Sequence, residues 1–384
     1  MKQHDIPTFL AQKKVYFLLI TLGLIAKILL LPVRTGDFVG FLQPWLNFIQ
    51  SHGYFSSLKY NFYDYTPAYI YILILIAKIG LNPLICIKIT SIFFEYIAAF
   101  FVGKIAGLKF KTLPMVWIAM AIVPLLPSVL LNSSYLSQCD SIYAAFVFGS
   151  IYFLFIQKQL LSVLMLGIAF SFKMQFVMLL PFYFVMLLRG NIRWHYFLLV
   201  PAVFIVSLLP AFVMGRSLTG LLNIYLSQAD HYPFLTLNFP NIYIFFDNAF
   251  YQPIKIIGMI ITFVFTFVFG IVLSLKKFKF SFDQWVRLVF LSAIVIPFLL
   301  PGMHERYMYL GDISGVLYWL ILRKKPLIPL GIWLISLYSY IRCSRFNDVL
   351  PMKPAFVLYF AVIFFTVIDF IQHFENESEI IYKK

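Results

Sequence analysis

Long apolar runs alternate with short polar intervals along the whole chain. A run of about 18 or more apolar residues can cross a bilayer as an α-helix, and only helices and closed barrels satisfy their backbone hydrogen bonds in lipid. The pattern therefore predicts an all-α polytopic transmembrane protein with about twelve spans. The predicted spans cover residues 15–33, 84–105, 112–131, 139–156, 160–172, 174–188, 195–213, 254–275, 284–300, 307–322, 326–341 and 355–372.

The loop after the first predicted span is long and aromatic. It runs from Arg34 to Pro67 and contains an aromatic, weakly amphipathic piece at 41–50. The apolar run that follows, 67–80, is too short for a comfortable span of about 20 residues. We therefore expect juxtamembrane helices at the outer surface here, with 67–80 as the clearest one.

Composition agrees with this assignment. The chain is 62% hydrophobic and 12% charged, with a mean hydropathy of +0.90, whereas a soluble domain carries roughly twice that charged fraction. No polar interval is long enough for a soluble domain, so residues 1–384 are expected to form a single membrane domain. The net charge of +15 comes from short basic clusters between apolar runs, which indicates contact with membrane lipids rather than nucleic acid.

The basic clusters also predict the orientation, because lysine and arginine favour cytoplasmic loops. All of them can be cytoplasmic only if 67–80 does not cross, and both chain termini then face the cytoplasm. The unusual polar residues between spans all emerge on the outer face in this topology, and such a gathering on one side is typical of an active site. The basic clusters are Lys13-Lys14, 104–111, Lys158, 189–193, 276–279 and 323–325.

Asp37 stands four positions beyond the end of the first predicted span, at Val33. It could simply solvate the loop. We favour a catalytic base, since an alcohol hydroxyl has a very high pKa and needs a carboxylate to take its proton when it reacts. Asp64 and Tyr65 follow in the same loop and are expected to bind sugar hydroxyls, although an interfacial aromatic belt would also explain the tyrosines.

Two further groups of polar residues lie between the middle spans. Gln138 and Asp140 are expected to bind substrate, with an ordinary helix cap as the alternative for Asp140. Lys173 interrupts a long apolar run, where an ammonium is costly unless it is paired or wet. A lipid phosphate would supply its missing counter-charge, so Lys173 and the nearby Gln175 are assigned to substrate binding, with snorkelling as the alternative.

His304, Glu305 and Arg306 follow a Pro-Gly pair at the end of another predicted span. Histidine, acid and arginine together at an outer edge are expected to form a clamp for phosphate or pyrophosphate. The alternative is a self-neutralising loop in which Glu305 pairs with Arg306.

Five motifs in this order resemble the GT-C superfamily of integral membrane glycosyltransferases, and are closest to bacterial relatives of the second mannosyltransferase of GPI-anchor assembly. They are Asp37 after the first span, Tyr-Asp-Tyr-Thr-Pro at 63–67, Ser-Gln-Cys-Asp-Ser at 137–141, Ala-Phe-Ser-Phe-Lys-Met-Gln at 169–175 and Pro-Gly-Met-His-Glu-Arg-Tyr at 301–307. The similarity covers residues 15–322, and 323–384 would be additional C-terminal spans with a cytoplasmic tail.

The resemblance implies a multi-pass enzyme of a bacterial cell membrane that moves mannose or another hexose from a polyprenyl-phosphate donor to a glycan or glycolipid acceptor. It implies an outward-facing site, inversion at the anomeric carbon, and the catalytic role for Asp37. The chain departs from the family where Ala68 follows Pro67, since many relatives have two prolines. Gly36 and Phe38 also flank Asp37 where many relatives place a second acid, so no metal or other cofactor is expected.

Two other functions stay open. A transporter of lipid-linked sugars would use the same aromatic and basic cavity, but it should show inverted repeats or polar residues at mid-membrane. A polysaccharide polymerase or ligase would carry its chemistry in a large later loop. The interval 215–253 is long enough to be such a loop and contains Asp230 and His231, so this alternative stays open.

Overall fold

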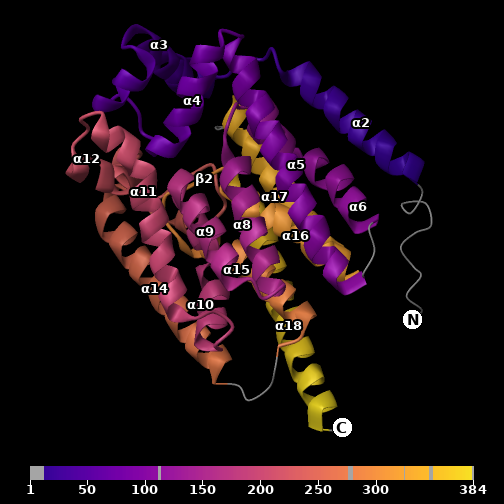
Figure 1. Cartoon of the computed structure of the whole chain (residues 1–384). Helices are drawn as coiled ribbons and strands as arrows, with labels where there is room; N and C mark the ends of the chain where they lie inside the picture. Colours follow the sequence, from indigo (N-terminus) through magenta and orange to yellow (C-terminus); the bar gives the residue numbers. More distant parts are fainter. Residues whose placement is uncertain (1–12, 111–113, 276–279, 324, 346–348, 383–384) are drawn as a thin grey trace. The chain divides into compact units, whose positions relative to one another are not determined.

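The computed structural model describes residues 13–110, 114–275, 280–323, 325–345 and 349–382 (Figure 1). These residues are almost entirely helical, which confirms the all-α prediction. Their only β-structure is a pair of two-residue parallel strands, β1 (Thr236–Leu237) and β2 (Met303–His304). The chain folds as two compact units: unit 1 takes the chain up to Met174 together with His195–His231, and unit 2 takes Gln175–Trp194 and the chain from Tyr232 onward.

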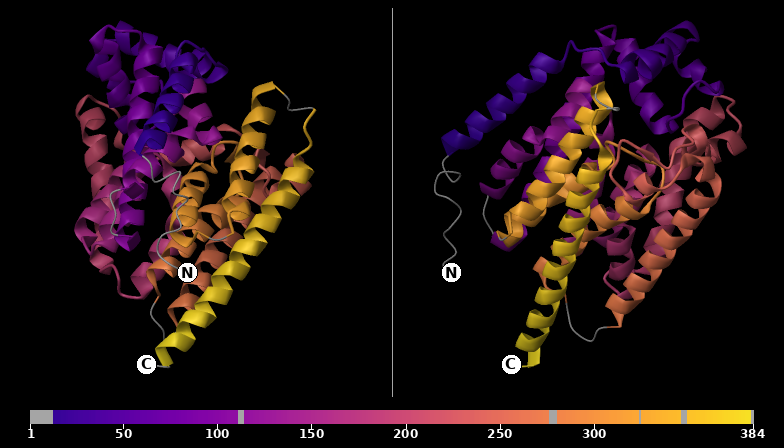
Figure 2. Two further views of the ribbon diagram at one scale, coloured as in Figure 1. Left: turned by 90° about the vertical axis from the view of Figure 1, so that its right-hand side faces the viewer. Right: turned by 180° about the vertical axis from the view of Figure 1, so that it is seen from behind.

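Unit 1 is built around α5, which packs against α6 and α8, while α8 in turn packs against α9, and α9 against α11. The short elements α3 and α4 group at one end of α5 in all three views (Figures 1 and 2). The helices of unit 1 are α2 (Lys13–Leu30), α3 (Gln43–Ser51), α4 (Pro67–Ile79), α5 (Pro83–Phe110), α6 (Pro114–Ile122), α7 (Pro127–Leu130), α8 (Asp140–Phe155), α9 (Gln159–Phe172), α11 (Leu199–Val213), α12 (Leu218–Leu222) and α13 (Ile224–His231). Short π and 3₁₀ turns join them at η1 (Phe38–Leu42), η2 (Tyr54–Lys59), η3 (Val123–Leu125) and η4 (Leu131–Tyr135).

Proline and glycine set the helix limits around α4 and α5. Pro67 and Pro83 each occupy the first helical position, where the missing N–H is not needed. Gly80 ends α4 in the left-handed conformation, with φ of 75°, which costs glycine little. The Asn82 side chain then accepts a hydrogen bond from the backbone N–H of Leu84 at 3.1 Å and so caps α5.

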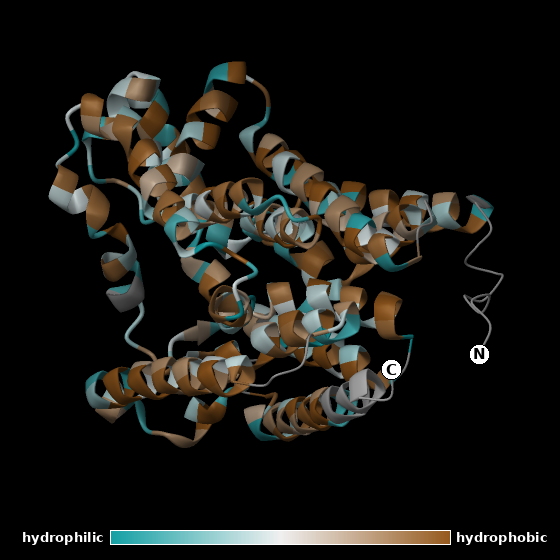
Figure 3. Ribbon diagram, turned by 60° about the horizontal axis from the view of Figure 1, so that its bottom comes forward, coloured by the Kyte–Doolittle hydropathy of each residue, from teal (hydrophilic) through white to brown (hydrophobic). Residues whose placement is uncertain are grey.

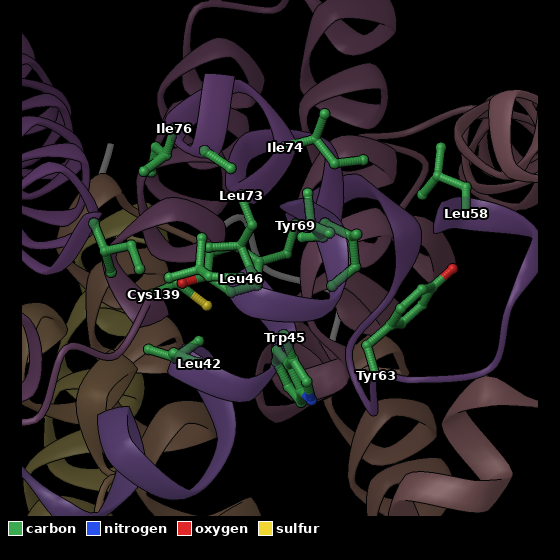
Figure 4. Packing of buried hydrophobic residues seen from close by; sticks show 14 of the residues in the cluster. Leu42, Trp45, Leu46, Leu58, Tyr63, Tyr69, Leu73, Ile74, Ile76 and Cys139 are labelled. Atoms are coloured by element: carbon green, nitrogen blue, oxygen red, sulfur yellow. The ribbon is translucent and has the colours of Figure 1, made fainter. Parts of the chain in front are cut away.

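A cluster of buried apolar side chains holds α3 and α4 together. Leu46 and Ile49 of α3 and Tyr69 and Leu73 of α4 are each at most 3% exposed. Figure 4 shows Leu46, Tyr69 and Leu73 meeting between the two helices, with Cys139 close by. The loop of the chain that carries Asp37 and Tyr65 is therefore supported by a packed core.

Unit 2 is a second bundle. In it α15 packs against α16 and α18, α16 packs against α17, and α17 lies beside α18 (Figure 2). A capping box of Ser281 and Gln284 starts α15. Its helices are α10 (Leu180–Leu188), α14 (Tyr251–Ser274), α15 (Phe282–Leu299), α16 (Tyr309–Leu322), α17 (Leu327–Arg345) and α18 (Met352–Tyr382), with turns η7 (Ile242–Phe245) and η8 (Asn248–Phe250). Two further 3₁₀ turns, η5 (Met174–Leu179) and η6 (Trp194–Leu198), lie where the chain passes between the units.

Six helices of the described chain are long and apolar enough to cross a membrane, or seven if a pair bent by 63°, Pro114–Leu125 with Pro127–Tyr135, is one span. Figure 3 shows the apolar character of these helices: hydrophobic residues dominate most helices, and polar residues gather at helix ends and connections. The six are Pro83–Phe110, Trp194–Val213, Asn248–Ser274, Phe282–Leu299, Leu327–Ser344 and Met352–His373. The protein therefore has the features of a multi-pass membrane protein.

The expected number of about twelve spans is not confirmed. Most helices begin and end close to the predicted limits, and the expected helix at 67–80 is present as α4. The predicted span 112–131 is divided between α6 and α7, and the helix predicted at 355–372 continues to Tyr382. However, five of the apolar helices have 10–17 residues, and at 1.5 Å per residue each falls short of the roughly 30 Å hydrocarbon core. The predicted first span, 15–33, corresponds to α2, which carries three lysines and is not among the six.

The contact between α5 and α6 gives a direct test of this packing. A Cβ atom added at Gly103 would lie 2.4 Å from the Cα of Val116, so Gly103→Ala must push the two helices apart. We expect a loss of about 1–3 kcal/mol, the usual cost of overpacking, seen as a lower melting temperature in detergent. Gly40→Ala is the matched control, because none of the described residues comes within 4 Å of its added Cβ. Equal melting temperatures for the two variants would contradict the close approach.

Candidate active site

Asp37 lies in the first turn of a helical segment that runs through η1 and α3. The positive end of a helix dipole favours a carboxylate at this position. The side chain is half-buried, and its Oδ2 accepts a hydrogen bond from Nε2 of Gln138 at 2.5 Å. The two residues are 101 positions apart in sequence, so the fold brings together the predicted base and a predicted substrate-binding amide.

The orientation of the Gln138 amide is determined by its two neighbours. An ionised carboxylate can only accept hydrogen bonds, so the amide nitrogen must face Asp37. The amide oxygen then accepts from the Tyr65 hydroxyl at 3.0 Å. The backbone carbonyl of Gln138 is held separately, by the hydroxyl of Ser91 on α5 at 2.9 Å.

Asp140 and Lys173 form a buried ion pair. Nζ of Lys173 lies 2.7 Å from Oδ1 of Asp140, and the two residues are 4% and 1% exposed. The second carboxylate oxygen accepts from Nδ2 of Asn132, also at 2.7 Å. Each oxygen of Asp140 therefore has a donor, which is what a charge at this depth requires.

Tyr65 joins the two groups. Its hydroxyl donates to Gln138, and its ring lies under the Lys173 ammonium, with 5.0 Å from Nζ to the ring centroid. A continuous polar path thus runs from Asp37 through Gln138, Tyr65 and Lys173 to Asp140. Four of the sequence-predicted binding residues and the predicted base meet in this one place.

Lys173 reaches this position because α9 stops just before it. Lys173 has an extended backbone, with φ of −152°, so helical hydrogen bonding is broken there. The Thr66 hydroxyl donates to the backbone carbonyls of Ser171 at 2.6 Å and of Phe172 at 3.2 Å, which satisfies the end of α9. Thr66 precedes α4, so this contact also ties the Tyr65 segment to the Lys173 segment.

One face of α5 supports the whole arrangement. Lys88, Ser91 and Glu95 are at most 1% exposed, and their spacing of three and four residues places them on the same side of the helix. Nζ of Lys88 donates to the carbonyls of Leu30 at 2.8 Å and Val33 at 2.7 Å, where α2 ends before Asp37. We name Lys88, Ser91 and Glu95 the polar face of α5.

Glu95 completes the polar face. Its Oε2 lies 2.5 Å from Nζ of Lys27 on α2, and its Oε1 accepts from the hydroxyl of Ser133. Ser133 follows Asn132, the residue that holds Asp140. The polar face of α5 therefore contacts the chain beside Asp37, beside Gln138 and beside Asn132.

The structure corrects two sequence-based interpretations. The counter-charge that Lys173 was expected to lack is supplied by Asp140, so a lipid phosphate is not needed to explain the lysine. Asp140 is also not the N-cap of α8: Cys139 holds that position without a side-chain cap, and Asp140 is the first helical residue.

Asp64 and Gln175 are among the predicted binding residues that do not join the network. Asp64 is exposed, and its backbone carbonyl, rather than its side chain, accepts from Nε2 of Gln228. Gln175 belongs to unit 2, and its side-chain oxygen is buried without a hydrogen-bond partner among the described residues.

His304, Glu305 and Arg306 lie in unit 2, at the end of β2. Nη1 of Arg306 is 2.9 Å from Oε1 of Glu305, so the self-neutralising pair that the sequence left open is formed. Burial acts to raise the pKa of the Glu305 carboxyl, but Arg306 and His304 outweigh burial and lower this pKa from 4.5 to about 2. Glu305 is therefore an anion at neutral pH, and Arg306 already has a carboxylate partner.

No group of three histidine, cysteine, aspartate or glutamate side chains within the described ranges could hold a metal ion together. The polar path from Asp37 to Asp140 contains two carboxylates, an amide, a phenol and an ammonium.

Sequence reasoning missed Asn132 and the polar face of α5. Lys88 and Glu95 stand inside the apolar run 84–105, and Lys27 inside the run 15–33. Charges within such runs are rare and functional as a rule, so they were a usable signal. Asn132 offered none, because an isolated asparagine beside two serines is typical of many loops.

Comparison of the chain with protein-family models, with characterised proteins and with solved structures gives no match.

Lys88 gives a test of the support from α5. Lys88→Met keeps most of the side-chain volume but leaves the carbonyls of Leu30 and Val33 without their donor. We expect a loss of about 1–3 kcal/mol of stability, as for other buried polar groups left unsatisfied. Thermal unfolding in detergent measures this, with Lys78→Met as the control because Lys78 is exposed at the end of α4. A drop no larger than that of the control would show that Lys88 does not hold the end of α2.

Proposed function

We propose that the protein is an inverting membrane glycosyltransferase that moves a hexose, mannose or another, from a polyprenyl-phosphate donor to a glycan or glycolipid acceptor. Asp37 is the catalytic base. The observation that carries this proposal is the setting of Asp37, a half-buried carboxylate that belongs to a polar path inside an otherwise apolar protein.

The two oxygens of Asp37 differ in a way that suits a base. Oδ2 accepts from Gln138, while Oδ1 has no hydrogen bond with the described residues. A positioned carboxylate with one oxygen anchored and one available can accept a proton from a hydroxyl that approaches it. The anchored oxygen limits rotation of the carboxylate, which keeps the other oxygen in one place.

The proposed reaction is a single displacement. The acceptor hydroxyl oxygen attacks the anomeric carbon, and the bond from that carbon to the phosphate oxygen breaks on the opposite face. The bonding electrons leave with the lipid phosphate, and the hydroxyl proton passes to Asp37. Phosphate is a good leaving group, so the base addresses the harder part of the step.

Asp140, Lys173 and Tyr65 are proposed to bind the substrate. Their charged and polar atoms suit sugar hydroxyls, and the buried Trp45, whose ring lies 5.5 Å from that of Tyr65, supports the Tyr65 ring from behind. The roles of Asp64, Gln175, His304, Glu305 and Arg306 toward the donor and acceptor rest on the resemblance of their motifs to the GT-C superfamily.

We also propose that the site faces outward from a bacterial cell membrane and that both chain termini are cytoplasmic. The support is the alternation of basic clusters along the sequence. Of these clusters, Lys111, 276–279 and Lys324 lie outside the described residues.

Cysteine labelling tests the orientation. In a protein without its natural cysteines, a cysteine at position 64 should react with a membrane-impermeant maleimide added outside intact cells. A cysteine at position 109 should react only after the membrane is opened, because Lys109 belongs to a predicted cytoplasmic cluster. External labelling at position 109 would reverse the topology.

Asp37→Asn tests the reaction itself. The change keeps the shape of the side chain but removes its ability to take a proton. We expect single-turnover transfer by the purified protein in lipid to fall by roughly 10²- to 10⁴-fold, as for a lost general base. Radiolabelled polyprenyl-phosphate mannose and its glucose and galactose counterparts are the donors to compare, and donor binding should persist.

Asp247→Asn is the matched control, because Asp247 is an exposed residue that caps the short turn η8 of unit 2. Its activity should equal that of the wild type. Near-normal transfer by the Asp37→Asn protein would show that another residue is the catalytic base. If the wild type transferred none of the three sugars, the proposed reaction would be wrong for these donors.

A further inference from the structure

A second cluster of charges lies in unit 2, around Asp369 of α18. Oδ2 of Asp369 lies 2.8 Å from Nε of Arg287 and accepts from the Tyr318 hydroxyl at 2.7 Å. Oδ1 lies 2.9 Å from Nζ of Lys325 and 3.4 Å from Nδ1 of His373. We name Arg287, Lys325, Asp369 and His373 the Asp369 cluster.

The cluster carries more positive than negative charge. Arg287 and Lys325 are both cations, and they share the single carboxylate of Asp369, so one positive charge is left over even when His373 is neutral. Arg287 is 3% exposed, and its Nη1 is buried with no acceptor among the described residues. Because Asp369 is shared with Lys325, it neutralises the buried Arg287 only in part, and an additional anion would complete the compensation.

Part of the cluster is open to the outside. The side chain of Lys325 is 41% exposed and that of His373 is 27% exposed, whereas Asp369 and Arg287 lie beneath them at 3% and 4%. An anion can therefore approach Lys325 from outside. The positive charge of Arg287, which lies beneath Lys325, would add to the attraction.

The position of the cluster indicates which anion is at hand. Arg287 is near the start of the candidate span Phe282–Leu299, Lys325 lies two residues before Leu327–Ser344, and Asp369 is one turn before the end of Met352–His373. Three spans thus end together at the cluster. The ends of spans lie at the depth of lipid headgroups, where basic groups between helices bind lipid phosphates.

Apolar rings lie next to the charges. Phe370 follows Asp369 directly, and its ring centroid is 6.4 Å from that of Phe280, which stacks on Trp285 at 4.4 Å. The guanidinium carbon of Arg189 lies 4.6 Å from the centroid of the Phe280 ring. Phe280 and Phe370 are 9% and 4% exposed, so the half-buried Trp285 is the ring of this group that offers apolar surface to an acyl chain.

We propose that the Asp369 cluster binds the phosphate of an anionic phospholipid headgroup, with Lys325 at the rim and Arg287 supplying the excess charge. This site belongs to unit 2 and does not depend on the transferase activity proposed for the Asp37 site. The lipid is a bound structural or regulatory ligand and undergoes no reaction.

The test compares lipid retention by the full-length protein and two variants. Wild type, Lys325→Gln and Lys353→Gln are purified into nanodiscs of phosphatidylcholine with a minor fraction of phosphatidylglycerol. Native mass spectrometry then counts the phosphatidylglycerol that stays bound on release. Lys353→Gln removes the same charge from an exposed lysine at the opposite end of α18, so it controls for general attraction to anionic lipid.

We expect wild type and Lys353→Gln to retain phosphatidylglycerol equally, and Lys325→Gln to bind it about fivefold more weakly, the effect of one basic residue at a membrane surface. Equal retention by Lys325→Gln and Lys353→Gln would overturn the proposal. Lys325 is partly exposed and lies outside the helices, so Lys325→Gln should fold normally. The comparison therefore tests lipid binding rather than stability.

Inorganic phosphate in detergent separates the two possible sources of the anion. The melting temperature of the wild type should rise with added phosphatidylglycerol and should rise less with inorganic phosphate at the same concentration, since free phosphate makes no apolar contact. Equal protection by inorganic phosphate would assign the cluster to a free anion and would overturn the lipid.

Discussion

Unit 1 depends on the need to pair every charge that its apolar helices bury. Lys88 and Glu95 are each 0% exposed on α5, and a buried charge is tolerated only when donors or acceptors meet it. Their partners come from the end of α2, from Lys27 and from Ser133. A rotation of α5 about its axis by one residue, about 100°, would leave Lys88 and Glu95 buried without these partners. The pairing therefore determines how α2 and η4 lie against α5.

The path from Asp37 to Asp140 follows the same requirement at the site. Carboxylate, amide, phenol, ammonium and carboxylate succeed one another: Gln138 donates to Asp37, Tyr65 donates to Gln138, and Lys173 contacts both the Tyr65 ring and Asp140. Polar groups that are already held in place need little reorientation when charge develops in a transition state. Water has to reorient, and this difference is a main source of electrostatic catalysis by proteins. The path also keeps the two carboxylates separate: Gln138 contacts one and Lys173 the other.

Apolar run length predicted where the helices lie, and the polar residues at the ends of those runs predicted most of the site. Asp37, Gln138, Asp140 and Lys173 stand where runs break, which a single sequence can show. Their pairing cannot be seen there, so the Asp140 counter-charge of Lys173 was missed. Lys88 and Glu95 interrupt the apolar run 84–105, which was a usable signal, but their partners cannot be seen in the sequence either. The number of spans was harder to predict, because helices of 13–16 residues such as α4 and α8 look apolar yet are too short to cross alone.

The separation of 101 residues between Asp37 and Gln138 has a consequence for biosynthesis. At the usual elongation rate, Gln138 leaves the ribosome about 5 to 20 seconds after Asp37. Glu95, the ion-pair partner of Lys27, is likewise synthesised later than α2. Helix α2 must therefore enter the membrane environment while the charge of Lys27 is uncompensated. Helix α2 can therefore take its final position only after α5 has arrived, and a nascent chain stalled before Glu95 should leave α2 accessible to water-soluble reagents.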